Sequence, residues 1–254
     1  MSNIDKMPWD QLRGRGFRPQ RERAVPAMVP QLYGKSRNDA RLNIYLPEVS
    51  RWTAERTLVV AAFHGEEPET TNVLAASLRT LTTRALRTAV ILCANPDGMA
   101  AGTRGNAVNV DLNRNFPASN WQPNTTKTRW ELGMKRLVEL SPGEQPASEP
   151  ETHHLIQAIG TYGIKQIVSL HAPLECIDYT QDEDWPLVEA LSDGMRLPVQ
   201  RVGHPTPGSL DAWATEQNIR LVTPEFSDDL ALSDMRYEYG PTLVRLLAGE
   251  LPGL

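Results

Sequence analysis

Two residues of types that bind zinc, His64 and Glu67, stand three positions apart directly after an apolar run at 57–63. A catalytic zinc site takes imidazole nitrogen and carboxylate oxygen from three protein ligands and leaves a further position for water. A His at the end of a strand and a Glu one turn later can face the same ion, and Gly65 permits a tight backbone turn between them. Because this spacing is common by chance, it indicates a metal site only if a third ligand exists.

His171 is the candidate third ligand, because it also follows an apolar run, at 165–170. A lone His at a strand end is more often an ordinary hydrogen-bonded residue. The chain has only five His, however, and two of them end apolar runs. Two such residues are less expected by chance than one, so His64 and His171 together favour a metal site.

Two arginines, Arg104 and Arg114, lie ten positions apart in a polar stretch between these ligands. A guanidinium group suits a carboxylate because it can form two parallel hydrogen bonds with it. A peptidase that acts at a C-terminus needs such a clamp, and it also needs a cation near the carbonyl oxygen on which charge develops. The two arginines could fill these roles, although by themselves they would be interpreted as surface residues of a loop.

The elements that must position these residues alternate along the chain. Four apolar runs are expected to be buried strands, at 57–63, 88–94, 165–170 and 219–223. Helical patterns accompany them, at 70–82, 148–159, 185–195 and 237–247. The alternation predicts an α/β fold with a mixed, largely parallel central sheet and helices on both faces. The helix at 148–159 is expected to open with a capping box formed by Ser148 and Glu151.

The polar residues that end the predicted strands are His64, Asn95, His171 and Glu225. In open α/β sheets, ligands bind beyond the carboxyl ends of the strands. We therefore expect a site at this edge of the sheet that gathers residues far apart in the sequence.

Composition limits the classes of function and the domain organisation. The 254 residues carry a formal net charge of −5, so no bulk attraction for nucleic acid or an anionic membrane is expected. The two cysteines, Cys93 and Cys176, are too few for a disulfide framework and are expected to be reduced. Residues 1–24 form a polar arm with five arginines but no nucleic-acid motif, and 25–254 are expected to form a single domain. Neither a signal peptide nor a membrane span is recognisable, which favours a cytoplasmic location.

Six motifs, in this order, resemble the zinc carboxypeptidases of the pancreatic class. They are HGEE at 64–67, NPDG at 95–98, VDLNRNF at 110–116, SEPET at 148–152, SLH at 169–171 and TPEF at 223–226. No single motif is decisive, but six in one order are highly specific, and the likeness spans about residues 55–230. The resemblance implies the α/β/α sandwich of that family, with residues 25–254 as the catalytic domain.

The resemblance also implies the catalytic roles. His64, Glu67 and His171 would bind one Zn²⁺ per chain. Arg104 would steady the carbonyl oxygen of the scissile bond. Glu225 would act as general base, taking a proton from the attacking water and passing it to the leaving amine.

The substrate-binding roles follow from the same resemblance. Asn113 and Arg114 would hold the terminal carboxylate, and Ser209 and Leu210 lie in the segment that lines the specificity pocket in relatives. Pancreatic members carry a mobile tyrosine shortly before that segment, whereas this chain has none there. His204 falls at or next to that place and is the candidate replacement.

Five segments carry a closer likeness within the family: NPDG at 95–98, VDLNRNFPASNW at 110–121, SEPET at 148–152, PLECI at 173–177 and TPGS at 206–209. They resemble a short bacterial branch, the murein peptide amidases. The resemblance implies hydrolysis of the γ-D-glutamyl–meso-diaminopimelate bond of the murein tripeptide L-Ala-γ-D-Glu-meso-diaminopimelate during cell-wall recycling. The far end of diaminopimelate is a zwitterion and needs a polar pocket. Leu210 cannot supply a charge there, so Glu175 and Asp178 are the candidate partners of the distal ammonium.

Two functions of other classes stay open. One is an N-acyl-amino-acid deacylase of the aspartoacylase type, which shares HGxE, an Asn-Arg pair and a late Glu. The other is a metal-free, peptide-binding relative, which would be expected to have lost a ligand or the base, although this chain retains both. A homo-oligomer is compatible with the sequence, which leaves the oligomeric state open.

Overall fold

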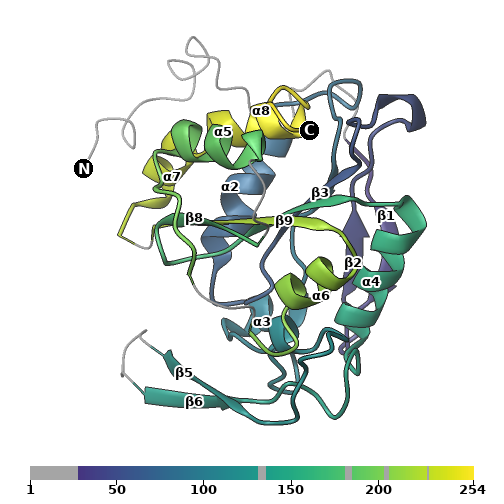
Figure 1. Cartoon of the computed structure of the whole chain (residues 1–254), viewed down its shortest axis with the longest axis vertical. Coiled ribbons are helices and arrows are strands. Elements are labelled where there is room, and N and C mark those ends of the chain that lie inside the picture. The colour runs from purple at the N-terminus through teal and green to yellow at the C-terminus, as the bar shows by residue number, and fades with distance from the viewer. Residues whose placement is uncertain (1–27, 131–135, 181–184, 203–205, 228) are drawn as a thin grey trace, which may run out of the picture.

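The computed structural model describes residues 28–130, 136–180, 185–202, 206–227 and 229–254. Its centre is a five-stranded sheet with the order β4–β3–β7–β9–β8 (Figure 1). The strands are β3 (Thr57–Ala61), β4 (Ala89–Ile91), β7 (Gln166–Leu170), β8 (Cys176–Tyr179) and β9 (Arg220–Glu225). β8 runs antiparallel to β9 and the other neighbours are parallel, so the predicted mixed, largely parallel sheet is confirmed.

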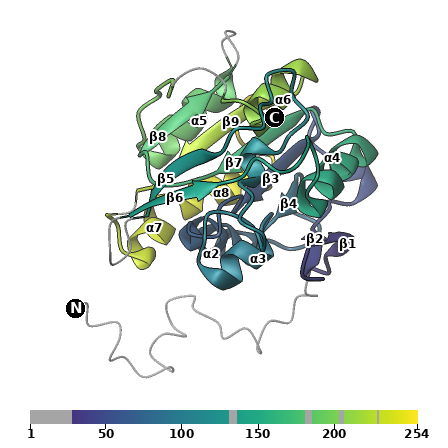
Figure 2. The ribbon, with the colours of Figure 1, turned by 90° about the horizontal axis from the view of Figure 1, so that it is seen from below.

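Helices cover both faces of this sheet (Figures 1 and 2). One face carries α2 (Pro68–Leu78), α5 (Pro186–Met195), α7 (Leu232–Glu238) and α8 (Gly240–Leu247), and the other carries α4 (Pro150–Tyr162) and α6 (Leu210–Glu216). A hydrophobic core lies on each side of the sheet. Because both faces are covered, β3 and β7 are buried at every position, including the polar Gln166 and Ser169 of β7.

The chain leaves the sheet earlier than the apolar run at 57–63 suggested. β3 ends at Ala61, and Ala62 adopts a positive φ of 54°. Such a left-handed residue breaks the extended geometry of a strand. Phe63 and His64 therefore belong to the loop that follows the carboxyl end of β3, where a ligand site is expected.

The capping box predicted at Ser148 and Glu151 is wrong. The N-cap of α4 is Glu149, which makes no side-chain cap bond, and the Ser148 hydroxyl donates to the Glu149 carboxylate at 2.9 Å. The Glu151 carboxylate instead accepts from the backbone N–H of Arg37 at 3.3 Å. The segment around Arg37 competes for these acids, because its guanidinium also pairs with Glu149 at 3.0 Å.

The helix predicted at 237–247 is two helices. Tyr237 belongs to α7, and α8 begins at Gly240 with Pro241 in its first turn. Proline has no backbone N–H and cannot continue the hydrogen-bonding pattern of a preceding helix. The break therefore follows from Pro241, which favours the first turn of a new helix.

Smaller elements surround the sheet. They are β1 (Gln31–Lys35), β2 (Arg41–Ile44), η3 (Val49–Arg51), α3 (Pro96–Ala101), η4 (Leu112–Arg114), β5 (Thr126–Trp130) and β6 (Arg136–Leu140). Cys93 and Cys176 are free thiols. Among the described helices, none combines the length and the apolar character needed to cross a bilayer. The predicted arm at 1–24 lies outside the described residues, so the division at residue 25 stays a prediction.

Candidate active site

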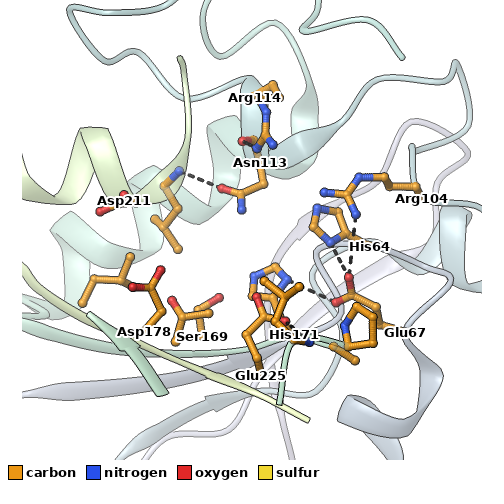
Figure 3. A pocket seen from close by; sticks show the side chains of 16 residues that line it. His64, Glu67, Arg104, Asn113, Arg114, Ser169, His171, Asp178, Asp211 and Glu225 are labelled. Atoms are coloured by element: carbon orange, nitrogen blue, oxygen red, sulfur yellow. Dashed lines mark hydrogen bonds and ion pairs between the residues drawn. The ribbon is translucent and has the colours of Figure 1, made fainter. Parts of the chain in front are cut away.

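The three predicted metal ligands converge beyond the carboxyl ends of β3 and β7 (Figure 3). Nδ1 of His64 lies 2.6 Å from Oε1 of Glu67, and Nδ1 of His171 lies 3.1 Å from Oε2 of the same carboxylate. One ligand atom of each residue lies within 4.8 Å of the others, and all three residues are buried. Two imidazoles and one carboxylate are a donor set that catalytic zinc uses, so these residues fit that ion.

The backbone between His64 and Glu67 is confined to a tight turn. The N–H of Glu67 donates to the carbonyl of His64 at 3.3 Å, and Glu67 is the N-cap of α2. A Cβ at Gly65 would overlap the backbone of Gly98 and its neighbour. Gly65 is therefore required by close approach of two chain segments.

The NPDG motif supports the loop that carries His64. The Asn95 side chain accepts from the N–H of Gly98 at 2.9 Å, which caps α3, and donates to the carbonyl of Phe63 at 3.1 Å. The Phe63 ring stacks on the imidazole of His171 with centroids 5.9 Å apart. The predicted strand-end residue Asn95 thus lies at the expected edge of the sheet. Its bond to Phe63 fixes the loop that carries His64.

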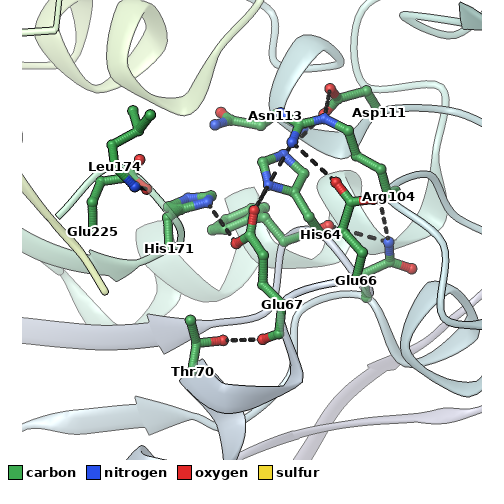
Figure 4. A network of polar contacts seen from close by, with 12 residues as sticks. His64, Glu66, Glu67, Thr70, Arg104, Asp111, Asn113, His171, Leu174 and Glu225 are labelled. Carbon is green, nitrogen blue, oxygen red and sulfur yellow. Dashed lines mark hydrogen bonds and ion pairs between the residues drawn. The ribbon is translucent and has the colours of Figure 1, made fainter. Parts of the chain in front are cut away.

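Asp111, to which the sequence motifs assigned no role, connects the ligand cluster to Arg104 (Figure 4). Its Oδ1 lies 3.4 Å from Nε2 of His64, and its Oδ2 accepts from Nε of Arg104 at 3.1 Å. Nε2 of His64 is buried and has no well-formed hydrogen bond to any described residue. A buried carboxylate beside Nε2 favours the tautomer with hydrogen on Nε2, which leaves the lone pair of Nδ1 for a metal.

The charges around the cluster keep both buried carboxyls ionised. Burial alone would raise the pKa of Glu67, but the charges and hydrogen bonds of His64 and His171 outweigh it and lower the pKa to about 2. Burial likewise opposes ionisation of Asp111, yet Arg104 and His64 bring its pKa well below the ordinary value. Both groups are therefore anionic at neutral pH, as a cation site requires.

Arg104 lies beside the metal ligands with its charge held in place. Its Nη1 lies 3.5 Å from Oε1 of Glu66 and 3.9 Å from Oε1 of Glu67. Burial would lower the pKa of this guanidinium, but Asp111, Glu67 and Glu66 together raise it. A permanently charged donor next to the ligand cluster is suited to a carbonyl oxygen that gains negative charge.

Glu225 ends β9 and forms a backbone bridge with His171. Its carboxylate lines the same cavity as the metal ligands, and Oε2 lies 3.5 Å from the N–H of Leu174. Burial raises the pKa of Glu225; His171 opposes the shift and Glu67 adds to it. A carboxylate with a raised pKa is better suited to accept a proton and return it than one at its ordinary value.

Asn113 and Arg114 lie on η4 and line the same cavity, whose volume is about 320 Å³. The side-chain Oδ1 of Asn113 accepts from the N–H of Leu210 at 2.9 Å, which turns the Asn113 amide nitrogen toward the cavity (Figure 3). Nη1 of Arg114 donates to the backbone carbonyl of Asn113 at 2.6 Å. The two neighbouring donor groups are thus oriented by the protein and can hold a carboxylate.

The remaining predicted residues differ in where they lie. Leu210 lines the cavity, whereas the Ser209 hydroxyl accepts from the N–H of Ala212 at 3.1 Å and caps α6. His204 lies outside the described residues, so its role stays a prediction. Glu175 is not among the lining residues, since its carboxylate accepts from the hydroxyl of Ser227.

Four polar residues line the cavity away from the metal ligands. They are Ser169, Asp178, Asp211 and Thr223. Of these four, only Asp178 is predicted from the sequence. Alternation along β7 and β9 could have indicated Ser169 and Thr223, but their meeting with Asp211 depends on how α6 lies over the sheet.

Comparisons with known proteins agree with this geometry. A family model described as zinc carboxypeptidase matches residues 41–192. The chain is 41% identical over 211 residues to murein peptide amidase A of Escherichia coli strain K12, which covers 82% of this chain and 86% of that protein. It is 36% identical over 219 residues to murein peptide amidase A of Vibrio campbellii, covering 84% and 87% of the two chains.

Among solved structures, murein-tripeptide amidase MpaA from Escherichia coli O157 matches with a TM-score of 0.81 and 37% identity, covering 91% of this chain and 96% of that chain. The matched residues of the family model contain all three candidate metal ligands, Arg104 and the Asn113–Arg114 pair. By sequence, fold and the arrangement of its site, the chain belongs to the zinc carboxypeptidase family.

Proposed function

We propose that the protein is a zinc-dependent amidase that hydrolyses the γ-D-glutamyl–meso-diaminopimelate bond of murein tripeptide. The observation that carries the proposal is one cavity with a His-Glu-His cluster and Glu225 at one side and the Asn113–Arg114 donor pair at another. This arrangement supports cleavage next to a free carboxylate. The names of the relatives, murein peptide amidase A and murein-tripeptide amidase, support the choice of substrate.

In this proposal His64, Glu67 and His171 hold one zinc ion per chain. Bound zinc would supply Lewis-acid chemistry and make water a nucleophile near neutral pH. Glu225 lies in the same cavity and accepts the proton of the attacking water. It then returns that proton to the amine nitrogen of diaminopimelate as the amide bond breaks.

The other residues orient the substrate. Arg104 faces the carbonyl oxygen and stabilises the negative charge that develops on it. Asn113 and Arg114 bind the carboxylate next to the cleaved bond, which positions the scissile amide against the metal cluster. In the same proposal His204 supplies a hydrogen bond to the substrate. Leu210 lines the pocket for the leaving residue, and Ser209 contributes to that pocket by capping α6.

A direct assay tests the proposal. Incubation of the purified, zinc-loaded protein with L-Ala-γ-D-Glu-meso-diaminopimelate is expected to release free diaminopimelate, followed by mass spectrometry. The matched substrate with a carboxamide in place of the carboxylate next to the cleaved bond is expected to react at least about 10² times more slowly, because the clamp loses its ion pair.

Each alternative gives a different result in that assay. Cleavage of N-acyl-amino acids but not of the tripeptide would favour the deacylase. Tripeptide binding by a protein that holds less than one zinc per chain by elemental analysis, and that releases no product, would favour the metal-free relative. Release of apolar C-terminal residues as fast as diaminopimelate would leave a general carboxypeptidase.

Asp111→Asn is expected to weaken zinc binding by about 10–100-fold. The substitution keeps the shape of the side chain but removes the negative charge that faces Nε2 of His64 and Nε of Arg104. The measurement is the zinc dissociation constant in competition with a coloured chelator. Asp39→Asn, at an exposed acid paired with Lys35, is the matched control. An unchanged zinc affinity in the Asp111 variant would show that this carboxylate does not support the ligand.

The proposal includes a cytoplasmic location and a part in recycling of cell-wall peptides, which the sequence resemblance implies. Both are testable together, because deletion of the gene in the source cell is expected to leave murein tripeptide unprocessed in the soluble fraction. Unprocessed tripeptide confined to the fraction outside the inner membrane would contradict the location.

A further inference from the structure

A row of polar side chains crosses three neighbouring strands on the sheet face beneath α6. Asp178 of β8 pairs directly with Thr223 of β9. Ser169 of β7 follows the registered pair Val168 and Val222, which places it next to Thr223. Because successive residues of a strand point to opposite faces, all three lie on one face. It is the face of Ile167 and Leu221, which belong to the core beneath α4 and α6.

Asp211 adds a fourth polar side chain, from the helix α6 that packs on this face of the sheet. It lies in the first turn of α6, next to Leu210, and lines the cavity together with Ser169, Asp178 and Thr223. Figure 3 shows Asp178, Ser169 and Asp211 at the side of the cavity away from Glu67. In the proposed function, the carboxylate next to the cleaved bond binds at Asn113. The side chain of the leaving residue would then extend toward Asp178, Ser169 and Asp211.

The two acids are held in an environment that disfavours their charges. Burial, and then the nearby charge of Asp178, raises the pKa of Asp211 to about 6. Burial also raises the pKa of Asp178, although backbone N–H groups of Val202 and Tyr179 and the charge of Arg201 act in the opposite direction. Two carboxylates facing a common space repel each other. A cation placed between them would offset this repulsion and the cost of burying their charges.

The cavity offers acceptors that the described protein leaves without donors. Oδ1 of Asp211 is buried and has no hydrogen-bond partner among the described residues. Independently, Ser169 is only 1% exposed, and its hydroxyl also lacks a partner in the described part of the chain. Buried polar atoms are normally paired, so these two atoms point to a ligand that supplies N–H groups.

We propose that Asp178, Asp211 and Ser169 together bind an ammonium group at the far end of the leaving residue's side chain. An ammonium has three N–H donors, and the three side chains offer three acceptors. The inference rests on the proposed function and narrows it to leaving residues that carry a distal amine, such as diaminopimelate. Leu210 contributes apolar surface beside the methylene groups, and selectivity comes from the two acids.

The test uses two pairs of tripeptides that differ only in that amine. L-Ala-γ-D-Glu is followed by diaminopimelate or 2-aminopimelate in one pair, and by lysine or norleucine in the other. The amine preference is the ratio of kcat/KM within a pair, and we expect about 10² or more for the native protein. Asp178→Asn and Asp211→Asn are each expected to lower this ratio by about tenfold, and the double variant by about a hundredfold.

Controls separate specificity from damage to the fold. Asp193→Asn, at an exposed acid of α5, removes one charge elsewhere and is expected to retain the native ratio. Asn at 178 keeps an oxygen that can accept the N–H groups of Tyr179 and Val202. Thermal unfolding and zinc content verify that each variant is intact, and the single variants carry the test if the double variant does not fold.

A binding measurement adds a readout that does not depend on turnover. Free diaminopimelate is expected to bind more tightly than 2-aminopimelate by calorimetry, and this difference should shrink in the two Asn variants. Equal amine preference in native and variant proteins would overturn the inference while tripeptide cleavage still supported the proposed function. Preference for lysine over norleucine without cleavage of the diaminopimelate peptide would reject the murein substrate and keep the ammonium site.

Discussion

Glu225→Gln is expected to lower kcat by about 10²–10⁴ while the protein still binds one zinc per chain. Glutamine keeps the shape of the side chain and one oxygen, but it cannot take a proton from water at neutral pH. Glu225 lines the cavity without belonging to the cluster of His64, Glu67 and His171. The metal ligands should therefore be unaffected, and the loss should fall on the chemical step.

The measurement is the steady-state rate of diaminopimelate release at saturating tripeptide, with zinc content determined on the same sample. Glu189→Gln, the same change at an exposed position of α5, is the matched control and is expected to be fully active. A near-native kcat in the Glu225 variant would place the base elsewhere. Loss of zinc from that variant would instead make Glu225 a ligand.

The meeting of the candidate metal ligands could be predicted from the sequence because of the sheet topology. His64 and His171 follow β3 and β7, and Glu225 ends β9. These three strands are neighbours and parallel, so their carboxyl ends meet at one edge. Continuous apolar runs reveal such strands, and the polar residue that ends each run marks the edge where a ligand binds.

The far end of the cavity could not be predicted in the same way. Asp178 lies on β8, the antiparallel strand, and it faces Thr223 only through a specific register with β9. Asp211 reaches the same space because α6 crosses that face of the sheet. Both facts are properties of tertiary packing. By sequence alone the loop acid Glu175 is an equal candidate, and only the structure shows that its carboxylate is bonded to Ser227.

Local signals failed where buried charges compete for the same partners. Ser148 and Glu151 match the capping-box pattern, but Glu149 and Glu151 instead bind Arg37, which is more than a hundred positions away in the sequence. Asn106 donates to Glu149 at 2.7 Å in the same network. Charge-assisted bonds inside the protein are stronger than an exposed cap, so tertiary pairing overrides the local motif.

The fold has little need of a metal to form. Buried apolar side chains fill a core on each face of the sheet. A structural zinc site that folds a small domain would be expected only where such cores are absent. The α/β/α layers are therefore expected to persist whether or not the candidate ligands hold an ion.

Removal of the metal is accordingly expected to abolish tripeptide hydrolysis, with loss of at least about 10³ in rate, and to leave the far-ultraviolet circular dichroism spectrum unchanged. The melting temperature should fall, because zinc that binds only the folded state stabilises it. At a zinc concentration a thousand times the dissociation constant, binding adds about 4 kcal/mol to the free energy of unfolding. Dialysis against a chelator already saturated with zinc is the control, and one equivalent of zinc should restore the rate. Full activity at less than a tenth of an equivalent of bound metal would reject the zinc mechanism and with it the roles of His64, Glu67 and His171.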